Sequence, residues 1–251
     1  MVSLVFLLNP RLSKFMIATI SKYVSLLKIG LYNRHLLLLV WGLINSKKTY
    51  LTTPKLLSFV ECVRQARERH PGKPLQIAEF GVGRGGSAMV LAWLANRYGG
   101  TLTLYDMFGR IPSPGGKDGE QAQERYQFIL KNESKEYYGN ITNLLEVVKQ
   151  ELSNVCDPDQ VVFVQGKYED TLPLQQQAHA FDFVHIDCDW YESSKTVFAF
   201  LQKNLNRGAM LQVDDYSNWQ GSQLATDETQ WLCGCRKWLV DGALVVDTAI
   251  C

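Results

Sequence analysis

The sequence predicts an α/β fold in which a mainly parallel sheet carries helices on both faces. Apolar segments of strand length alternate with segments of helical periodicity, and a glycine-rich turn joins the first such strand to a helix. Acidic residues follow several of the predicted strands. The 251 residues, 46% hydrophobic and 20% charged, suffice for one catalytic domain with an appendage.

The first strand is predicted over residues 75–80 and leads into Gly81, Gly83 and Gly86, which match the pattern G-x-G-x-x-G. Glycines at this spacing allow close approach to a ligand and direct the N–H groups of a helix N-terminus at its charge. A tight turn without a ligand is the alternative. Met89 and Trp93 then fall on one face of the predicted helix.

The chain before this strand has an unusual charge. Residues 1–60 carry eight Lys and Arg but no Asp or Glu. Residues 61–251 therefore hold the other 18 of the 26 basic residues and all 25 acidic ones, which gives that part of the chain a net charge of −7. A basic amphipathic helix is predicted, with one apolar face: Leu12, Met16, Ile20, Tyr23 and Leu27. We expect residues 1–50 to form an appendage to a domain over residues 51–251. We expect a second subunit to pack against this apolar face, which would give a homo-oligomer. An anionic membrane and an acidic carrier protein are the alternative partners.

Targeting signals are not expected. The apolar residues 2–8 lack a basic leader and a cleavage site, and the apolar run 36–44 is too short to span a bilayer.

The cysteines lack zinc-site spacing, so they are interpreted as reduced thiols of a cytoplasmic protein. They are Cys62, Cys156, Cys188, Cys233, Cys235 and Cys251.

The remaining elements continue the alternation. A helix is expected over residues 54–69, where Pro54 suits the first turn. Residues 109–120 form a Pro/Gly-rich loop, so we expect a substrate lid over residues 107–152 that includes helices at 121–130 and 141–152. Further strands are predicted at 102–105, 161–164, 181–186 and 209–213. A helix is predicted at 192–205, with Gly208 beyond its end. A hairpin is predicted from strands 237–240 and 243–247, joined by the turn Asp241-Gly242.

The acidic residues should share one rim, because ligands of open α/β sheets bind at the carboxyl ends of parallel strands. Glu79 lies within the first strand, Asp106 follows the second, Asp187 the fourth, and Asp214 and Asp215 the fifth. Asp106 stands 20 residues after Gly86, the spacing at which a carboxylate binds the ribose of a cofactor held over the glycines. NAD and S-adenosylmethionine (SAM) both satisfy this pattern.

A metal site is predicted from the carboxylates that follow the last two strands. Asp187, Asp214 and Asp215 would repel one another without a cation, and they offer the hard oxygen ligands that Mg²⁺ or Mn²⁺ prefers. Exposed turn carboxylates are the alternative. Asp189 is a further ligand, an outer-shell partner or a general base, whereas His185 is interpreted as a strand residue packed against the sheet.

Five motifs together resemble the macrocin O-methyltransferase family, whose enzymes use SAM and magnesium to methylate sugar hydroxyls of macrolides. They are AEFGVGRGGS, LYDMFGRIP, GKYEDTLP, FDFVHIDCDWYES and GAMLQVDDYSNWQG, between about residues 50 and 225. The resemblance implies a class I methyltransferase sheet with a final antiparallel strand. It places Glu79, Gly81 and Ser87 at the methionine end of SAM, Asp106 at its ribose, Gly166, Lys167 and Tyr168 near its adenine, and Asp187, Asp214 and Asp215 on the metal. Gly83 is a further expected cofactor-binding residue.

The implied reaction is methyl transfer to a hydroxyl of a small molecule, a sugar or other natural product. A metal lowers the pKa of the hydroxyl and orients it, which makes Asp187 and Asp189 the candidate catalytic residues. Catechol methyltransferases, which this architecture also resembles, have a lysine where this chain has Trp190. Deprotonation then falls to the metal, to Asp189, or to a lid residue such as Glu120 or Glu124.

Two other functions are open at this stage. An NAD-linked oxidoreductase or epimerase would share the glycines and Asp106, and the chain contains the required Tyr-x-x-x-Lys pair as Tyr191 and Lys195. A non-catalytic SAM-fold docking protein would not need the clustered acids. Nucleic acid is not an expected partner, because an acidic rim repels phosphate.

Overall fold

The computed structural model describes residues 10–131, 137–175 and 180–251. Its centre is a seven-stranded sheet in the order β3-β2-β1-β4-β5-β7-β6. Strands β1 to β5 are parallel, and β7 runs antiparallel to β5 and to β6. The strands are β1 (Gln76–Phe80), β2 (Thr101–Asp106), β3 (Val161–Gln165), β4 (Phe181–Ile186), β5 (Leu205–Val213), β6 (Arg236–Val240) and β7 (Ala243–Asp247). The predicted α/β class is confirmed.

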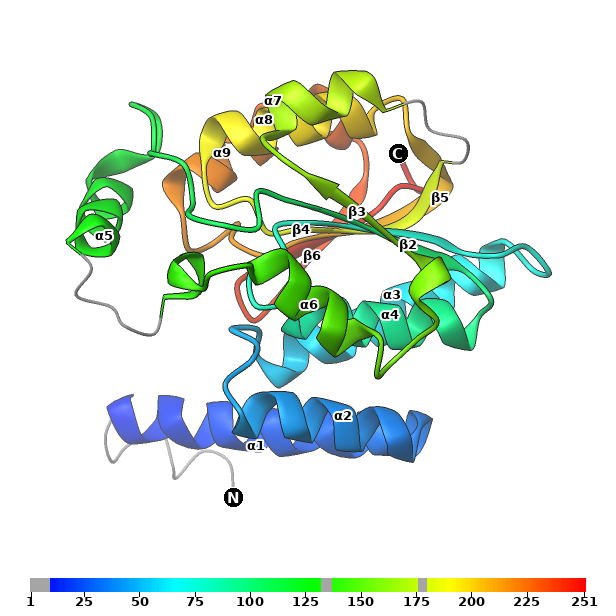
Figure 1. Cartoon of the computed structure of the whole chain (residues 1–251). Helices are drawn as coiled ribbons and strands as arrows, with labels where there is room; N and C mark the ends of the chain where they lie inside the picture. Colours follow the sequence, from blue (N-terminus) through cyan, green and yellow to red (C-terminus); the bar gives the residue numbers. More distant parts are fainter. Residues whose placement is uncertain (1–9, 132–136, 176–179) are drawn as a thin grey trace.

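Helices cover both faces of this sheet, as expected from the alternation of elements (Figure 1). One face carries α3 (Thr53–Arg69), α4 (Gly86–Arg97) and α6 (Leu144–Leu152), and the other carries α7 (Tyr168–Thr171), α8 (Tyr191–Leu201) and α9 (Gln220–Asp227). Helix α5 (Gly119–Leu130) stands apart at one end of the sheet. Two clusters of buried hydrophobic side chains fill the layers between the sheet and its helices.

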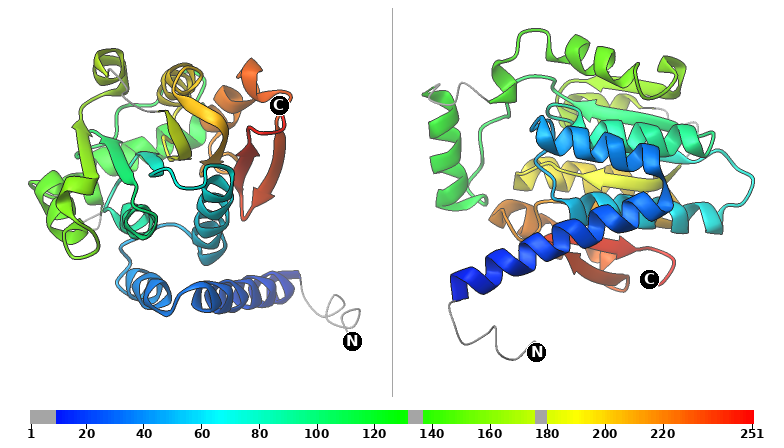
Figure 2. Two further views of the ribbon diagram at one scale, coloured as in Figure 1. Left: turned by 90° about the vertical axis from the view of Figure 1, so that its right-hand side faces the viewer. Right: turned by 90° about the horizontal axis from the view of Figure 1, so that it is seen from below.

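The N-terminal helices form an additional layer. Helices α1 (Pro10–Tyr32) and α2 (Arg34–Asn45) lie in one layer outside α3 and α4 (Figure 2). Leu26 and Ile29 of α1 and Leu36 of α2 are buried in the same core cluster as β1 and β2. The inner face of these two helices therefore belongs to the same hydrophobic core as the sheet. Within the described residues, no helix has both the length and the apolar character needed to cross a membrane.

One predicted boundary is wrong. The expected helix 192–205 ends at Leu201, and residues 205–208 already belong to β5. Gly208 does not end the helix: it has φ +80° inside β5, where the pairing with β4 shifts register between Phe181 and Phe183. A β-bulge at a glycine explains the error, since Leu205 continues the apolar spacing of the helix and hides the start of the strand.

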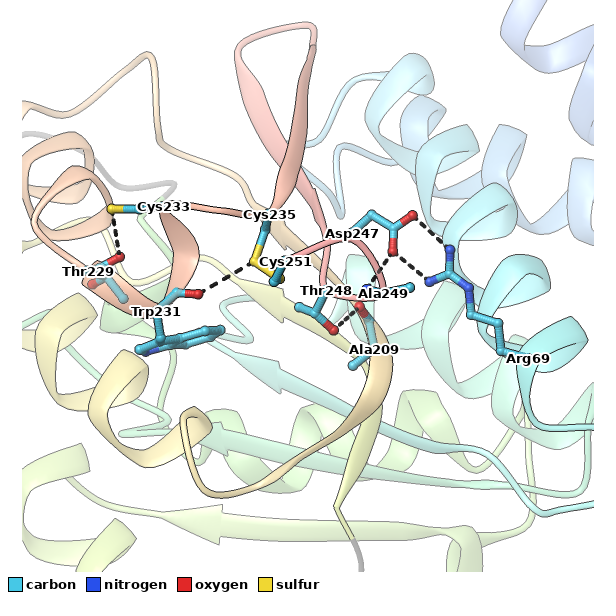
Figure 3. The surroundings of a disulfide bond; sticks show 10 residues. All are labelled: Arg69, Ala209, Thr229, Trp231, Cys233, Cys235, Asp247, Thr248, Ala249 and Cys251. Carbon is cyan, nitrogen blue, oxygen red and sulfur yellow. Dashed lines mark hydrogen bonds and ion pairs between the residues drawn. A yellow bond between two sulfur atoms is a disulfide. The ribbon is translucent and has the colours of Figure 1, made fainter.

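The prediction that all six cysteines are reduced thiols is corrected near the C-terminus of the chain. Cys235 and Cys251 form a disulfide that joins the start of β6 to the residues after β7 (Figure 3). The expectation of reduced thiols throughout is therefore wrong for this pair, and cysteine usage no longer argues for a reducing compartment. Cys62, Cys156, Cys188 and Cys233 are free thiols.

The same region contains an ion pair between the end of α3 and the end of β7. The Nη1 and Nη2 atoms of Arg69 donate to the two carboxylate oxygens of Asp247 at 2.8 and 2.7 Å (Figure 3). The Asp247 side chain is 3% exposed. Burial would raise the pKa of Asp247, but the paired Arg69 holds it below its ordinary value. This two-point contact attaches the outer antiparallel strands to the helix layer.

Replacing Arg69 with Met is expected to lower the free energy of unfolding by about 2 kcal/mol at neutral pH, because charge-assisted hydrogen bonds to a buried carboxylate are lost. The pair stabilises the fold above the ordinary pKa of Asp247, near 4, and this contribution fades as the pH falls further. Urea unfolding at several pH values measures both effects. Arg64→Met, which removes an exposed pair with Glu68, is the control, and an equal loss in both variants would contradict the prediction.

Candidate active site

The site lies at the carboxyl ends of the parallel strands, where backbone hydrogen bonds continue past β1 and β4. The N–H of Gly81 donates to Tyr105 O at 3.0 Å, and the N–H of Asp187 donates to Phe80 O at 2.8 Å. Gly81 and Asp187 are thereby held side by side. Both line two adjoining cavities of about 620 and 370 Å³. The predicted convergence of strand ends at one rim is confirmed for these residues.

The three glycines of the motif have different structural roles. A Cβ atom on Gly81 would lie 1.9 Å from Asp187 O, and one on Gly86 would lie 2.4 Å from Lys48 O. A Cβ on Gly83 would meet only the ring of Tyr138, at 3.8 Å. The first and third glycines thus make room for the backbone of the protein itself. Gly83, with φ +52°, is the one of the three at which an added Cβ would not clash with the backbone, and all three glycines line the larger cavity.

The predicted metal ligands come together in the larger cavity. Asp187, Asp214 and Asp215 each offer an oxygen, and these oxygens all lie within 4.8 Å of one another. Asp214 Oδ1 and Asp215 Oδ2 are buried and accept no hydrogen bond from the described residues. Asp189 lines the same cavity with φ +56°. Burial, followed by repulsion from Asp215, raises the pKa values of Asp187 and Asp189 well above the ordinary value.

A buried lysine that the sequence did not reveal completes this cluster. Lys55 of α3 donates from Nζ to Asp214 Oδ2 at 2.9 Å and to Asp214 O at 3.2 Å. The residue is 5% exposed and lines the larger cavity. Burial would raise the pKa of Asp214, but His185 and Lys55 lower it. Asp214 is therefore an ionised carboxylate that its neighbours hold in place.

Glu79 and His185 lie behind the cavity wall. Glu79 Oε1 is 2.8 Å from His185 Nδ1, and both side chains are fully buried. His185 Nε2 lies 3.9 Å from Asp214 Oδ1. Burial would lower the pKa of His185, but Asp214 and Glu79 raise it to about 9. The structure therefore does not place Glu79 on the cavity surface, where the family resemblance implied it. His185 is packed in the sheet as expected, and it lies between Glu79 and Asp214.

Asp106 shapes the glycine loop as well as lining the smaller cavity. Its Oδ2 accepts from the N–H groups of Val82 at 2.6 Å and Gly83 at 3.2 Å, and its Oδ1 accepts from Phe108 at 2.5 Å. Burial raises the pKa of Asp106, and these three backbone donors oppose the rise. The other predicted cofactor residues lie on the same two cavities: Ser87 on the larger one, and Gly166, Lys167 and Tyr168 on the smaller one.

The predicted lid divides into parts with different packing. Asp118 anchors its opening loop: its Oδ1 accepts from Tyr191 N at 2.6 Å and its Oδ2 from Gly115 N at 2.6 Å. Trp190 Nε1 donates to Pro112 O at 2.9 Å, which joins the same loop to the start of α8. Helix α6 buries Val148 in the hydrophobic core, whereas α5 buries only Ala122 and Ile129. A substrate lid over residues 107–152 stays a prediction.

The Tyr-x-x-x-Lys pair required for an oxidoreductase does not face either cavity. Tyr191 OH accepts from Lys117 Nζ at 2.7 Å and donates to Glu228. Lys195 Nζ lies 3.9 Å from Glu228 Oε2. These contacts engage both side chains on the surface between α8 and α9, so the geometry gives them no access to a bound cofactor.

Comparison with known proteins agrees with this architecture. The solved O-methyltransferase NovP matches with a TM-score of 0.66 and 22% identity over 79% of this chain and 81% of that one. CalS11, a calicheamicin methyltransferase, matches with a TM-score of 0.60 and 20% identity over 77% and 78% of the two chains. Together with the strand order, these likenesses define the fold of a class I methyltransferase.

The sequence identifies the family more closely. The model of the family described as Macrocin-O-methyltransferase (TylF) matches residues 47–236, so this chain belongs to that family. A protein of Streptomyces olivaceus, 8-demethyl-8-(2,3-dimethoxy-alpha-L-rhamnosyl)-tetracenomycin-C 4'-O-methyltransferase, is 29% identical over 151 residues, 58% of this chain and 54% of that protein. The chain thus spans about half the length of this curated relative.

Proposed function

We propose that this protein transfers a methyl group from SAM to a hydroxyl of a sugar or other natural product, with the help of Mg²⁺ or Mn²⁺. The observation that carries the proposal is the cluster of Asp187, Asp214 and Asp215 in the larger cavity, of which Asp187 also lines the smaller one. Family membership supports methyl transfer, and the Streptomyces olivaceus relative, named for a methylated rhamnosyl compound, supports a sugar acceptor.

The residues fit a divalent cation. Two carboxylate oxygens of the cluster, on Asp214 and Asp215, lack a hydrogen-bond donor although they are buried, and such atoms are costly unless a ligand satisfies them. Oxygen-only donors suit Mg²⁺. When bound there, the cation would act as a Lewis acid that lowers the pKa of an acceptor hydroxyl. Lys55 and His185 would hold Asp214 in a fixed position for this role.

The residues also fit SAM in a position that spans both cavities. Gly83 lines the larger cavity, and Asp106, on the smaller one, is the acceptor proposed for the ribose hydroxyls. Gly166, Lys167 and Tyr168 would surround the adenine, while Gly81 and Ser87 would border the methionine end. In this proposal Glu79 acts through His185 and does not contact SAM.

Asp189 is the proposed proton acceptor. It lines both cavities beside the carboxylate cluster, where its carboxylate could take up a proton from an acceptor hydroxyl. Trp190, at the position of the catechol methyltransferase lysine, cannot accept a proton, and its Nε1 donates to Pro112 O. Glu120 and Glu124 of α5 stay as alternatives, although neither lines the two cavities.

Calorimetric titration with SAM tests the cofactor part of this proposal. Asp106→Asn is expected to weaken SAM binding by about 2 kcal/mol, roughly thirtyfold, because one carboxylate acceptor is lost and the loop that it holds is disturbed. Asp170→Asn, at an exposed residue outside both cavities, is the control and should bind SAM like the unmodified protein. Binding of NADH in place of SAM would contradict the methyltransferase proposal.

A further inference from the structure

We propose that the outer face of α1 and α2 binds the surface of a membrane that contains anionic lipids. This inference does not depend on the proposed methyl transfer. It rests on two features that coincide on one side of the molecule: a continuous exposed apolar face and a chain segment that contains no acidic residue. Figure 2 shows both helices in a single layer on that side.

The apolar face is large and regular. Nine of the 18 exposed large hydrophobic residues among those described lie on these two helices. Leu31 is 79% exposed, Leu27 64% and Ile20 58%. The spacing of i, i+7 and i+11 along α1 places them on one side, opposite the buried Leu26 and Ile29. The nine residues are Met16, Ile17, Ile20, Tyr23, Val24, Leu27 and Leu31 of α1, and Leu38 and Trp41 of α2.

An exposed apolar patch of this extent marks a surface that binds a partner or a membrane. The core already occupies the inner side of both helices, so no other part of the described chain covers the outer side. Helix α2 extends the patch, because Leu38 and Trp41 lie opposite its buried Leu36 and Val40. Trp41 is also a residue type that favours the boundary between headgroups and acyl chains.

The charge of this segment indicates which kind of partner packs against the apolar face. Residues 1–60 contain eight Lys and Arg and no Asp or Glu, and Lys28, Arg34 and Lys47 are exposed on or beside the two helices. In a symmetric dimer the same face would meet itself, so these cations would oppose cations with no acid to pair them. Anionic lipid headgroups supply the opposite charge. The complementarity therefore favours a lipid surface over a second copy, which was the cover expected from the sequence.

The binding geometry is peripheral. The inner sides of α1 and α2 are packed against α3 and α4, so both helices can lie in the plane of a membrane while the catalytic domain stays outside it. The segment that follows α2 leads directly into the larger cavity, which Lys48, Thr49 and Tyr50 line. Binding by this face would hold that cavity near the lipid surface.

Vesicle flotation with the full chain tests the proposal. The protein is expected to float with vesicles of phosphatidylcholine and phosphatidylserine at roughly three to one, and at least about tenfold less with phosphatidylcholine alone. The double variant Ile20→Asp/Leu27→Asp should lower binding about tenfold or more. Leu239→Asp, at a residue 59% exposed on β6, is the matched control and should bind normally.

A second variant separates charge from folding. Lys28→Glu/Arg34→Glu retains the whole apolar face and should lose binding to the anionic vesicles, with a thermal unfolding midpoint equal to that of the unmodified protein. Equal flotation with both vesicle types would overturn the proposal, as would a folded protein that binds neither. A dimer seen by light scattering that Leu27→Asp dissociates, without vesicle binding, would assign the face to a second copy.

Discussion

Replacing Asp187 with Asn is expected to lower the methyl-transfer rate about a thousandfold, equivalent to about 4 kcal/mol, because the proposed cation loses one of its three carboxylates. The substitution is nearly isosteric, so the fold should persist. Asp187 is also the residue whose backbone lies against Gly81, and the N–H that holds it there is unchanged by the substitution. Transfer of labelled methyl from SAM to a sugar acceptor measures the effect.

Chelation gives an independent measure of the same dependence. EDTA should abolish transfer, and Mg²⁺ or Mn²⁺ should restore it in the unmodified protein but not in Asp187→Asn. Asp241→Asn is the control, since Asp241 belongs to the exposed β6–β7 turn and its positive φ suits asparagine. Undiminished turnover after exhaustive chelation would show that the three carboxylates serve another purpose.

Replacing Lys55 with Met is expected to lower the free energy of unfolding by about 3 kcal/mol in metal-free solution at neutral pH. The methionine fills the space of the lysine stem, but Asp214 then remains buried without its nearest cation. Breaking a buried ion pair by removing one partner has a cost of this order, and His185, 3.9 Å from Asp214, keeps the loss at the lower end of the range.

The direction in which Mg²⁺ changes the free energy of unfolding makes this test specific for the carboxylate cluster. Mg²⁺ should stabilise Lys55→Met more than the unmodified protein, because the variant has a more negative carboxylate cluster. The double variant Lys55→Met/Asp214→Asn should recover much of the lost stability, since both charges are then absent. Lys149→Met, at an exposed pair, is the control. A Lys55→Met protein as stable as the control would contradict the role given to this lysine.

Periodicity predicted the sheet well, because each buried strand is a short apolar run that ends at a polar residue or a glycine. The observed β2 and β4 match the predicted strands to within one residue at each end, and the Asp241-Gly242 turn does join β6 to β7. The metal-type carboxylates were also predictable, since parallel strands place their carboxyl ends at one edge. These successes depend on local sequence and on one rule of sheet geometry.

The parts of the site that were missed depend on contacts between elements. Lys55 lies in an amphipathic helix, where a lysine usually faces solvent, and only the packing of α3 against β4 and β5 brings it to Asp214. Glu79 is buried in the inner strand β1, and its partner there is His185, 106 residues later. Spacing also did not indicate that Cys235 pairs with Cys251. No pattern within a single segment carries this information.

The close approach of Gly81 to the carbonyl of Asp187 has a consequence for how the protein folds. The glycine loop and β1 are synthesised long before β4, yet the N–H of Asp187 must bond to Phe80 O for that approach to exist. Ordered pairing across so long a stretch of chain is slow, because the entropy of loop closure is lost before the contact forms. The nascent chain therefore carries an unfinished cofactor loop until β4 inserts beside β1, and the site reaches its final shape late in folding.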